Sequence, residues 1–445
     1  GCPATLRQRF ARFFYGHPVL GYLGTIATVT ALAVASFVSY THRHGGVTSD
    51  LWLTAIVVLL PLSELAISLI NLVVTSQVTP RQLPKLDMRT GIPAADRTMV
   101  AVPAIIDSEA RLVSLLDDLE VRFFANRDTH LHFALLSDFA DADERTKPND
   151  AVLVEAARRR IDELNARHGS DRFFLFHRAR QWNERENRWM GAERKRGKLA
   201  EFNRLLRGAT DTSYIVQHGE TSILPTIRYV ITLDSDTQLP MEAGRRLVGT
   251  LSHPLNRPRF DARLQRVTEG YGVLQPRISV SVVSANRTMF SKVFSGHVGV
   301  DPYTTAVSDL YQDMFHEGSY VGKGIYDVDA FDAALAGRVP ENTLLSHDLF
   351  EGFYARAGLV TDIDFVDDYP GSYLAFSARQ HRWVRGDWQI ARWLWRKVPG
   401  ASGEKVVNTL PVISRWKILD NLRRSLIPPA LVLLFAAGWT FVPGS

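Results

Sequence analysis

Long apolar segments constrain the fold of this chain more than any other feature of its sequence. The first, Val19–Tyr40, has 22 residues and no charged side chain, and a helix needs about 20 such residues to cross the hydrocarbon core of a bilayer. Leu51–Thr75 is a second segment of this kind, and Leu426–Val442 is a shorter third one. A buried core helix is the alternative for an apolar run, but the charge-free length of the first segment favours a membrane span. The sequence therefore predicts transmembrane helices on both sides of a central domain.

Charged residues in and around these segments predict their packing and orientation. Glu64 lies inside the second segment, where a carboxylate is costly unless it faces another helix or a polar cavity, and we expect it to serve helix packing ahead of transport. Arg43 is the only Lys or Arg between the first two segments. Basic residues gather instead on the other flanks: Arg7, Arg9, Arg12, Arg81, Lys85, Arg89, Arg415, Lys417, Arg423 and Arg424. Because positive residues stay on the cytoplasmic side, both flanks and the central domain are expected in the cytoplasm.

The net charge and the cysteine content limit which partners and metal sites this chain could have. The net charge is only +5, and this small, dispersed excess argues against a nucleic-acid partner, while a membrane surface or a phosphorylated substrate explains it equally well. Cys2 is the only cysteine, which excludes an intrachain disulfide and a cysteine metal site and is consistent with a cytosolic domain. The chain begins at Gly1 and ends within an apolar run, so we expect it to be a piece of a longer protein.

Strand-like and helix-like stretches alternate along the central domain. The β-rich runs are Thr98–Pro103, His132–Ser137, Arg172–His177, Arg228–Asp234 and Tyr271–Gln275. The amphipathic stretches between them include Ser108–Phe124, Asp150–Arg167 and Leu199–Leu206. This alternation predicts an α/β fold with a mostly parallel sheet, helices on both faces, and ligands at the carboxyl ends of the strands. The charged segment Arg178–Arg196 is expected to be a long polar excursion near that site.

Two carboxylates follow one of the predicted strands. The apolar run around Ile231 leads into Asp234 and Asp236, which are two positions apart. Alternate residues of an extended chain point the same way, so both carboxylates are expected on one side. Such a pair can hold a hard divalent cation that bridges nucleotide phosphates and neutralises a departing diphosphate. A surface turn uses the same residue types, but the position at a strand end favours metal binding by this pair.

Two further stretches carry side chains suited to a nucleotide. Asp138 closes another predicted strand, where it either binds a ligand or caps the next helix, and the residues alone leave both open. Four basic residues within 194–198 surround Gly197 at a predicted helix start, where the helix dipole favours a phosphate. An ordinary basic surface helix is the alternative, and no Walker pattern occurs. Lys198 is the candidate phosphate contact of this stretch.

A possible general base opens a later predicted helix. Leu345, Leu349 and Phe353 fall on one apolar stripe, and Asp348 lies off that stripe near the helix start. The alternative for Asp348 is a structural carboxylate that the helix dipole favours. The same alternative holds for Glu351, where it is the commoner case. Asp348 is therefore the predicted base.

Arginine and tryptophan cluster close to the third apolar segment. Arg379 and Trp383 are one helical turn apart, and Arg382 lies beside them. An indole can stack on a sugar ring while a guanidinium binds a diphosphate. The same residue types also mark membrane interfaces, an alternative that is stronger for Trp393 and Trp395 than for Trp383.

Taken in order, these motifs resemble processive inverting glycosyltransferases of the cellulose-synthase kind, which share the Rossmann-like GT-A fold. Two positions depart from that pattern: Arg379 stands where Gln is usual, and His347 stands where an acid precedes the base. The chain is more similar to the cyclic β-1,2-glucan synthases. That similarity rests on three strings of this chain: Leu-Asp-Ser-Asp-Thr-Gln-Leu-Pro from Leu233, Lys-Arg-Gly-Lys-Leu from Lys195, and Arg-Gln-His-Arg-Trp from Arg379.

The resemblance implies a membrane-bound inverting glucosyltransferase. It implies UDP-glucose as donor, a divalent metal (Mg²⁺ or Mn²⁺), and a growing β-1,2-glucan as acceptor. It also gives each candidate residue a role: base for Asp348, metal ligands for Asp234 and Asp236, donor contacts for Asp138, Lys198, Arg379 and Arg382, and acceptor stacking for Trp383. Another β-glucan linkage and a non-catalytic membrane scaffold are the alternatives. A haloacid-dehalogenase-like phosphatase is disfavoured, because no phosphate loop follows Asp236.

The expected organisation combines these predictions. Residues 1–18 form a cytoplasmic lead-in, 19–76 two transmembrane helices, 77–410 a cytoplasmic GT-A domain, 411–425 a basic interfacial helix and 426–445 a truncated transmembrane helix. The family implies the bacterial inner membrane, with a multi-pass topology and the catalytic domain in the cytoplasm. It also implies the lipid bilayer as a partner, together with the rest of a longer synthase chain that carries a phosphorylase-like domain.

Overall fold

An eight-stranded sheet forms the centre of the protein. The structure is a computed structural model that describes residues 16–296, 309–340, 342–344 and 348–441. The strand order is β12-β10-β11-β7-β1-β2-β3-β6. These strands are β1 (Thr98–Ile106), β2 (Leu131–Phe139), β3 (Phe173–Arg178), β6 (Tyr214–His218), β7 (Tyr229–Thr232), β10 (Val273–Val280), β11 (Gly324–Asp327) and β12 (Ala357–Asp367).

The sheet is mostly parallel, as predicted. Neighbours β1 and β2, β2 and β3, β1 and β7, and β10 and β12 pair in parallel, whereas β6 and β11 run against their neighbours. All nine residues of β2 are buried, because a strand covered on both faces carries apolar side chains almost continuously. The α/β fold is therefore confirmed, although β6, β11 and β12 are not among the strands predicted from the sequence.

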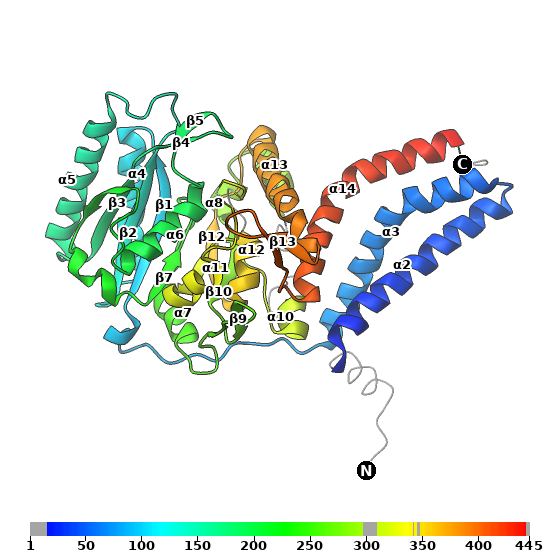
Figure 1. Cartoon of the computed structure of the whole chain (residues 1–445), viewed down its shortest axis with the longest axis horizontal. Coiled ribbons are helices and arrows are strands. Elements are labelled where there is room, and N and C mark those ends of the chain that lie inside the picture. The colour runs from blue at the N-terminus through cyan, green and yellow to red at the C-terminus, as the bar shows by residue number, and fades with distance from the viewer. Residues whose placement is uncertain (1–15, 297–308, 341, 345–347, 442–445) are drawn as a thin grey trace, which may run out of the picture.

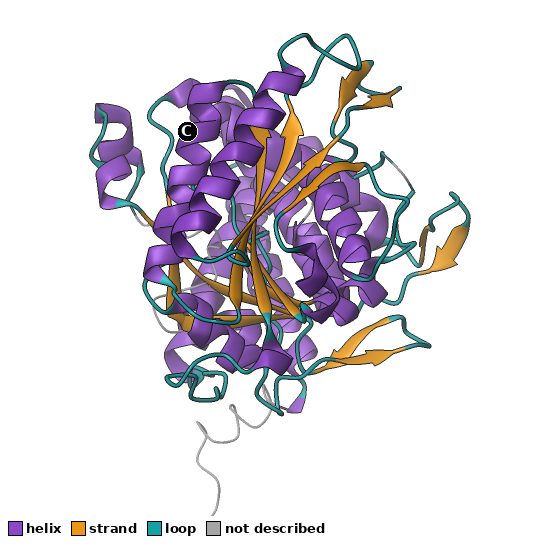
Figure 2. Ribbon diagram, turned by 90° about the vertical axis from the view of Figure 1, so that its left-hand side faces the viewer, coloured by secondary structure: helices purple, strands orange, loops and turns teal. Residues whose placement is uncertain are grey.

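Helices cover both faces of this sheet (Figure 2). One core contains Val100 and Val102 of β1 with residues of α4 (Glu109–Ala125), α5 (Asp150–His168) and α7 (Ala243–Leu251). The other contains Met99 and Ala101 of β1 with residues of α6 (Arg194–Leu206), α11 (Val328–Leu335) and α12 (Asp348–Ala355). Alternate residues of one strand thus enter opposite cores, as the pleat requires.

Shorter elements complete the described part of the central domain. The excursion Arg178–Arg196 contains a hairpin of β4 (Gln181–Asn183) and β5 (Arg188–Met190), and then α6 begins. The other elements are η1 (Ala94–Asp96), η2 (Thr221–Thr226), β8 (Arg259–Asp261), β9 (Arg266–Glu269), α8 (Val282–Ala285), α9 (Met289–Phe294), α10 (Leu310–Phe315), α13 (Tyr373–Gln389), η3 (Ile390–Leu394), β13 (Lys397–Pro399) and β14 (Lys405–Val407).

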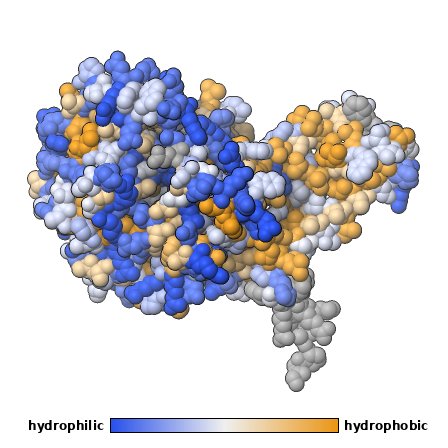
Figure 3. All heavy atoms as spheres, viewed as in Figure 1, coloured by the Kyte–Doolittle hydropathy of each residue, from blue (hydrophilic) through white to orange (hydrophobic). Residues whose placement is uncertain are grey.

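Three long helices project from the central domain as an arm (Figure 1). They are α2 (Pro18–Arg43), α3 (Thr48–Gln77) and α14 (Val412–Phe441), whose most apolar windows have mean hydropathies of 1.7, 2.3 and 1.2. Their length and composition suffice to cross a membrane, and apolar side chains dominate the surface of the arm (Figure 3). The sequence predicts a separate basic helix before residue 426. That division is wrong, because one continuous helix, α14, contains both segments and also Pro428 and Pro429.

Charged side chains join two helices of the arm, α3 and α14. Glu64 of α3 accepts a 2.7 Å hydrogen bond from the Arg423 guanidinium of α14, which also binds Asp420 at 2.7 Å. The Asp420 side chain is almost fully buried. Glu64 therefore faces another helix, which is the helix-packing arrangement predicted for it.

Candidate active site

Several loops meet at the edge of the sheet where β7 ends. Thr232 of β7 lies opposite Gly324, the first residue of the antiparallel strand β11. The loop after β7 carries Asp234 and Asp236, and the residue before β11 is Lys323. The arrangement places a basic residue beside the two carboxylates, at the edge where ligands bind in α/β sheets.

Two ammonium groups bind the Asp234 carboxylate. Lys195, from the first turn of α6, lies 2.5 Å from its Oδ1, and Lys323 lies 3.0 Å from its Oδ2. Lys323 also binds Asp367 at the end of β12. Burial alone would raise the pKa of Asp234, but the two lysines outweigh burial and hold this pKa well below its usual range. The carboxylate is therefore ionised and already neutralised by protein cations.

Asp348 reaches the same place from α12. The Lys195 ammonium donates to the carbonyl oxygen of Gly322 at 2.6 Å. A Cβ atom added to Gly322 would lie 2.5 Å from Oδ2 of Asp348, and the φ of this glycine is +84°. The Asp348 carboxylate thus packs directly against the backbone that binds Lys195. The structure brings Asp234 and Asp348 together, with Lys195 and Gly322 between them.

Glu351 lies one helical turn after Asp348 and is buried. Burial, with the neighbouring Asp348 charge, raises the pKa of Glu351 to about 8. Glu351 therefore holds its proton more tightly than an exposed glutamate does.

Hydrogen bonds from neighbouring elements hold the loop that carries Asp236. The buried guanidinium of Arg122 donates to the carbonyl oxygens of Ser235 at 2.9 Å and Thr237 at 2.9 Å. The Thr237 hydroxyl donates to Asp367 at 2.6 Å. Arg122 belongs to the amphipathic stretch of α4, where the sequence gives no sign that it supports a site.

Asp236 differs from Asp234 in its environment. Its side chain is exposed, and no ion pair involves it in the part of the chain that the structure describes. Partial dehydration of the carboxyl group, with repulsion from Asp234 and Asp367, raises its pKa above the ordinary value. A cation at this place would relieve that repulsion.

The carboxylates fit a divalent metal only in part. Among the described residues, no cluster of three or more His, Cys, Asp or Glu side chains could hold an ion by itself. Asp236 offers a carboxylate that forms no ion pair among the described residues, whereas each oxygen of Asp234 contacts an ammonium. An ion at this place would therefore take Asp236 together with ligand oxygens, and it would reach Asp234 only by displacing a lysine.

Asp138 and Lys198 belong to a separate buried cluster. Arg178 donates to both Asp138 oxygens, at 2.8 and 3.0 Å, and the Lys198 ammonium lies 3.0 Å from Oδ2. Lys198 also donates to the carbonyl oxygens of Ala104 and Leu136, at 2.8 and 3.3 Å. Burial lowers the pKa of Lys198 to about 8. All three donors of this ammonium are used inside the protein, and Lys195, rather than Lys198, is the lysine of this motif that reaches Asp234.

Helix α13 presents the predicted arginine and tryptophan to the site. The Arg379 guanidinium lies over the rings of Trp383 and Tyr369, with 4.9 and 5.4 Å to the centroids. Burial lowers the pKa of Arg379, while Tyr369 and the charges of Asp236 and Asp367 act in the opposite direction. Arg382 lies beside it, and Trp383 is 44% exposed. The helix thus offers an open indole next to a cation.

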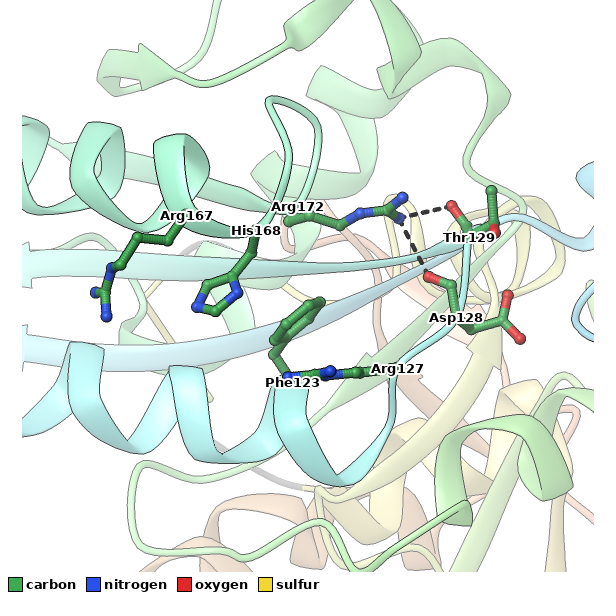
Figure 4. A pocket seen from close by; sticks show the side chains of 7 residues that line it. All are labelled: Phe123, Arg127, Asp128, Thr129, Arg167, His168 and Arg172. Atoms are coloured by element: carbon green, nitrogen blue, oxygen red, sulfur yellow. Dashed lines mark hydrogen bonds between the residues drawn. The ribbon is translucent and has the colours of Figure 1, made fainter.

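A separate hollow of about 600 Å³ lies at the opposite edge of the sheet (Figure 4). It is lined by Phe123, Arg127, Asp128, Thr129, Arg167, His168 and Arg172. Its basic groups are largely bonded already, since Arg172 donates to the carbonyls of Asp128 and Thr129. Arg167 and His168 both bind Glu120. The hollow therefore does not compete with the carboxylate edge as the candidate site.

Comparisons with known proteins support the expected resemblance. No protein-family model matches the chain. The cyclic β-(1,2)-glucan synthase NdvB of Rhizobium meliloti (strain 1021) is 46% identical over 387 residues, which are 86% of this chain and 13% of that protein. The structure of S. aureus TarS 1–349 matches 78% of this chain and 76% of its own, with a TM-score of 0.35 and 9% identity, a likeness too low to carry an argument. The chain is therefore a relative of the cyclic β-(1,2)-glucan synthases, and it spans about an eighth of the length of the synthase that it matches.

Proposed function

We propose that the chain is the glycosyltransferase unit of a cyclic β-1,2-glucan synthase. It would transfer glucose from UDP-glucose to the 2-hydroxyl of a growing β-1,2-glucan, with inversion at the anomeric carbon. The observation that carries this proposal is the convergence of Asp234 and Asp348 on Lys195 and Gly322 at the carboxyl edge of the sheet. The similarity to a glucan synthase over 86% of the chain supports the substrate class.

Asp348 is the proposed base. A sugar hydroxyl is a very weak acid, so its attack needs a positioned acceptor for its proton as the new bond forms. The Asp348 carboxylate packs against Gly322, where a Cβ atom would clash with it, and this contact helps to position the carboxylate. Burial raises the pKa of Glu351 to about 8, so Asp348 comes before Glu351 as the proposed base.

The leaving UDP would meet several cations. Lys195 and Lys323 lie at the carboxylates, and the charge of Arg379 in α13 interacts with them. A divalent metal, Mg²⁺ or Mn²⁺, would be held by Asp236, and by Asp234 where it displaces Lys195 or Lys323 from that carboxylate. Its chemistry, when bound, is to neutralise the charge that develops on the diphosphate. The lysines and Arg379 act on the same charge from the protein side.

The acceptor glucan is assigned to α13. Trp383 is 44% exposed and carries a guanidinium on one face, so its other face is suited to a sugar ring. Arg382 lies beside it on the helix, where it would add a donor for the diphosphate or a sugar hydroxyl.

The proposed location is the bacterial inner membrane. Three helices are apolar and long enough to span it, and basic residues precede or follow each span on the side of the central domain. The catalytic domain would then face cytoplasmic UDP-glucose. The remainder of the longer synthase, including its phosphorylase-like domain, would act on the glucan that this unit extends.

The test is release of UDP from UDP-glucose by the purified chain in lipid, with and without Mg²⁺ or Mn²⁺, in the presence of a β-1,2-glucan acceptor. Linkage analysis of the product then distinguishes β-1,2 from other β-glucans. We expect metal-dependent UDP release and 2-linked glucose. Absence of release with several metals and acceptors would favour the scaffold alternative, and another linkage would move the chain to a different β-glucan.

A further inference from the structure

The segment 281–294 exposes an unusual number of apolar side chains. Val282 and Val283 of α8 are 76% and 75% exposed, and Met289 of α9 is 77% exposed. Val293 and Phe294 at the end of α9 are 66% and 58% exposed. Folded proteins rarely leave a large contiguous apolar surface in water unless it contacts a partner or a membrane. We call this surface, with the adjoining N-terminal turn of α13, the α8–α9 face.

Helices α8 and α9 are packed against the rest of the fold. The Thr288 side chain caps α9 and donates to the Gly371 carbonyl at 2.9 Å. The Ser284 hydroxyl accepts from the Tyr369 backbone at 2.9 Å. Phe290 packs against Tyr369, Tyr373 and Phe376 with ring centroids 6.0 to 6.4 Å apart. The helices that carry the exposed side chains are therefore held in place by hydrogen bonds and ring contacts.

Helix α13 connects this face to the arm. Its first residues, Tyr373 and Leu374, are 66% and 78% exposed and extend the apolar surface. At its other end, Asp387 accepts a 2.7 Å bond from Asn421 and the Trp388 ring donates to Ser425 at 3.1 Å. These contacts lie on α14 just before its apolar run begins, and α13 rises beside α14 on the side of the arm (Figure 1).

The charges of the face suit a lipid surface. Residues 281–296 include Arg287 and Lys292 and no acidic residue. Arg287 lies 3.5 Å from Asp368, while Lys292 is exposed and forms no ion pair among the described residues. Valine, phenylalanine and methionine beside lysine and arginine are typical of helices that lie in the membrane interface.

We propose that the α8–α9 face docks on the anionic surface of the bilayer next to the spanning helices. The apolar side chains of α8, α9 and the start of α13 enter the interface, and Lys292 meets lipid headgroups. This inference rests on the membrane attachment included in the proposed function, and not on the glycosyl transfer. The docking fixes α13, and with it Arg379 and Trp383, beside the membrane.

The experiment places one environment-sensitive dye at a time on the full chain in lipid nanodiscs that contain anionic lipid. In a Cys2→Ser background, single cysteines are introduced as Val283→Cys and Val293→Cys. Leu433→Cys on α14, 62% exposed, is the reference for a lipid-facing site. Val152→Cys on α5, 64% exposed and far from the arm, is the matched control (Figure 1). Lipids that carry a nitroxide near the headgroup serve as quencher.

Dyes at positions 283 and 293 are expected to lose emission to the nitroxide lipid as the dye at 433 does, whereas the dye at 152 keeps its emission. Quenching at 433 but not at 283 and 293 overturns this inference and leaves the membrane arm intact. Dyes at 283 and 293 that are shielded equally in nanodiscs and in detergent also overturn it, since another part of the synthase or a second copy then covers the face. No quenching at 433 contradicts the membrane attachment itself.

Discussion

The Asp348 carboxylate packs against Gly322, which has no side chain to displace it, and a substitution at Asp348 tests the base directly. The change Asp348→Asn keeps the shape of the side chain but removes its ability to accept a proton. We expect the transfer rate to fall by roughly 10²–10⁴-fold. Binding of UDP-glucose should persist, because the cations proposed for the diphosphate lie on Lys195, Lys323 and Arg379. Turnover and donor binding are measured on the same folded preparation.

A purely structural Asp348 would behave differently. A carboxylate in the first turn of a helix contributes about 1 kcal/mol or less through the helix dipole, so its loss would lower stability slightly and leave turnover per folded molecule unchanged. That outcome would remove Asp348 from the base role and make Glu351 the next carboxyl group to test.

Glu351 predicts how stability depends on pH. Its pKa is about 8 in the folded chain and near 4.5 when exposed. Both states hold the proton below pH 4.5, but between pH 4.5 and 8 the unfolded chain releases it first, so unfolding becomes progressively easier as pH rises. The variant Glu351→Gln has no carboxyl group at this position, so its stability does not fall for this reason as the pH rises. We expect the melting temperature of this variant to match that of the wild type near pH 4.5 and to exceed it at pH 8. The corresponding gain in the free energy of unfolding at pH 8 is on the order of a few kcal/mol. A difference in melting temperature between variant and wild type that does not change with pH would contradict the raised pKa of Glu351.

At the scale of elements, α6 decides which lysine reaches the site. Lys195 and Lys198 are almost one turn apart, so the sequence pattern alone gives them nearly the same direction. The structure separates them. Helix α6 begins at Arg194, and Lys195 in its first turn contacts Asp234, while Lys198 is buried against Asp138 at the end of β2. The motif was thus predictable, but the division of its roles depends on how α6 packs.

The contact between β2, β3 and α6 predicts the effect of Asp138→Asn. This change leaves the buried charges of Arg178 and Lys198 without their carboxylate, and breaking a buried ion pair costs about 3–5 kcal/mol. The matched control is Asp141→Asn, whose pair with Arg194 is partly exposed and should cost about 1 kcal/mol or less. Chemical denaturation measures both. Normal stability with lost UDP binding would instead support the donor contact that the family resemblance implies for Asp138.

Helix α13 predicts a division between donor and acceptor. Trp383→Ala removes the exposed indole and leaves the Arg379 charge in place. We expect weaker chain extension, seen as a higher acceptor KM, with UDP affinity nearly unchanged. Trp395→Ala is the control, since that tryptophan is 71% exposed and lies beyond α13. A large loss of UDP affinity with normal acceptor use would place Trp383 on the donor side.

Over the whole molecule, local patterns predict elements better than their arrangement. Strands β1, β2, β3, β7 and β10 follow from apolar runs and turn residues, and the long apolar segments predict the arm. The antiparallel strand β11 has only four residues and pairs with two distant strands, so its position follows from tertiary packing. Lys323 and Gly322 precede this strand, which is why sequence reasoning missed both at the site.

Within the arm, one guanidinium joins α3 to α14. Arg423→Gln removes one partner of Glu64 and one partner of the buried Asp420, which still pairs with Arg424, whereas Glu64→Gln leaves Arg423 bound to Asp420. We expect Arg423→Gln to lower the melting temperature in detergent more than Glu64→Gln does, because it removes two ion pairs, one of them to a buried carboxylate, and Glu64→Gln removes only one. UDP binding by the folded fraction should be equal in both. Equal melting temperatures would show that the apolar contacts alone join α3 to α14.

Pro428 and Pro429 lie inside α14 just beyond this joint. Proline has no backbone N–H, so the carbonyls one turn earlier lose their helical partners and the helix resists bending less at this point. The first half of α14 is bonded to α13 and to α3, while the second half can tilt with little loss of hydrogen bonding. A bilayer that is thicker or thinner than the apolar run changes that tilt. In the proposed membrane, we expect differences in bilayer thickness to change the tilt of α14 beyond the prolines and to leave the carboxylate site in place.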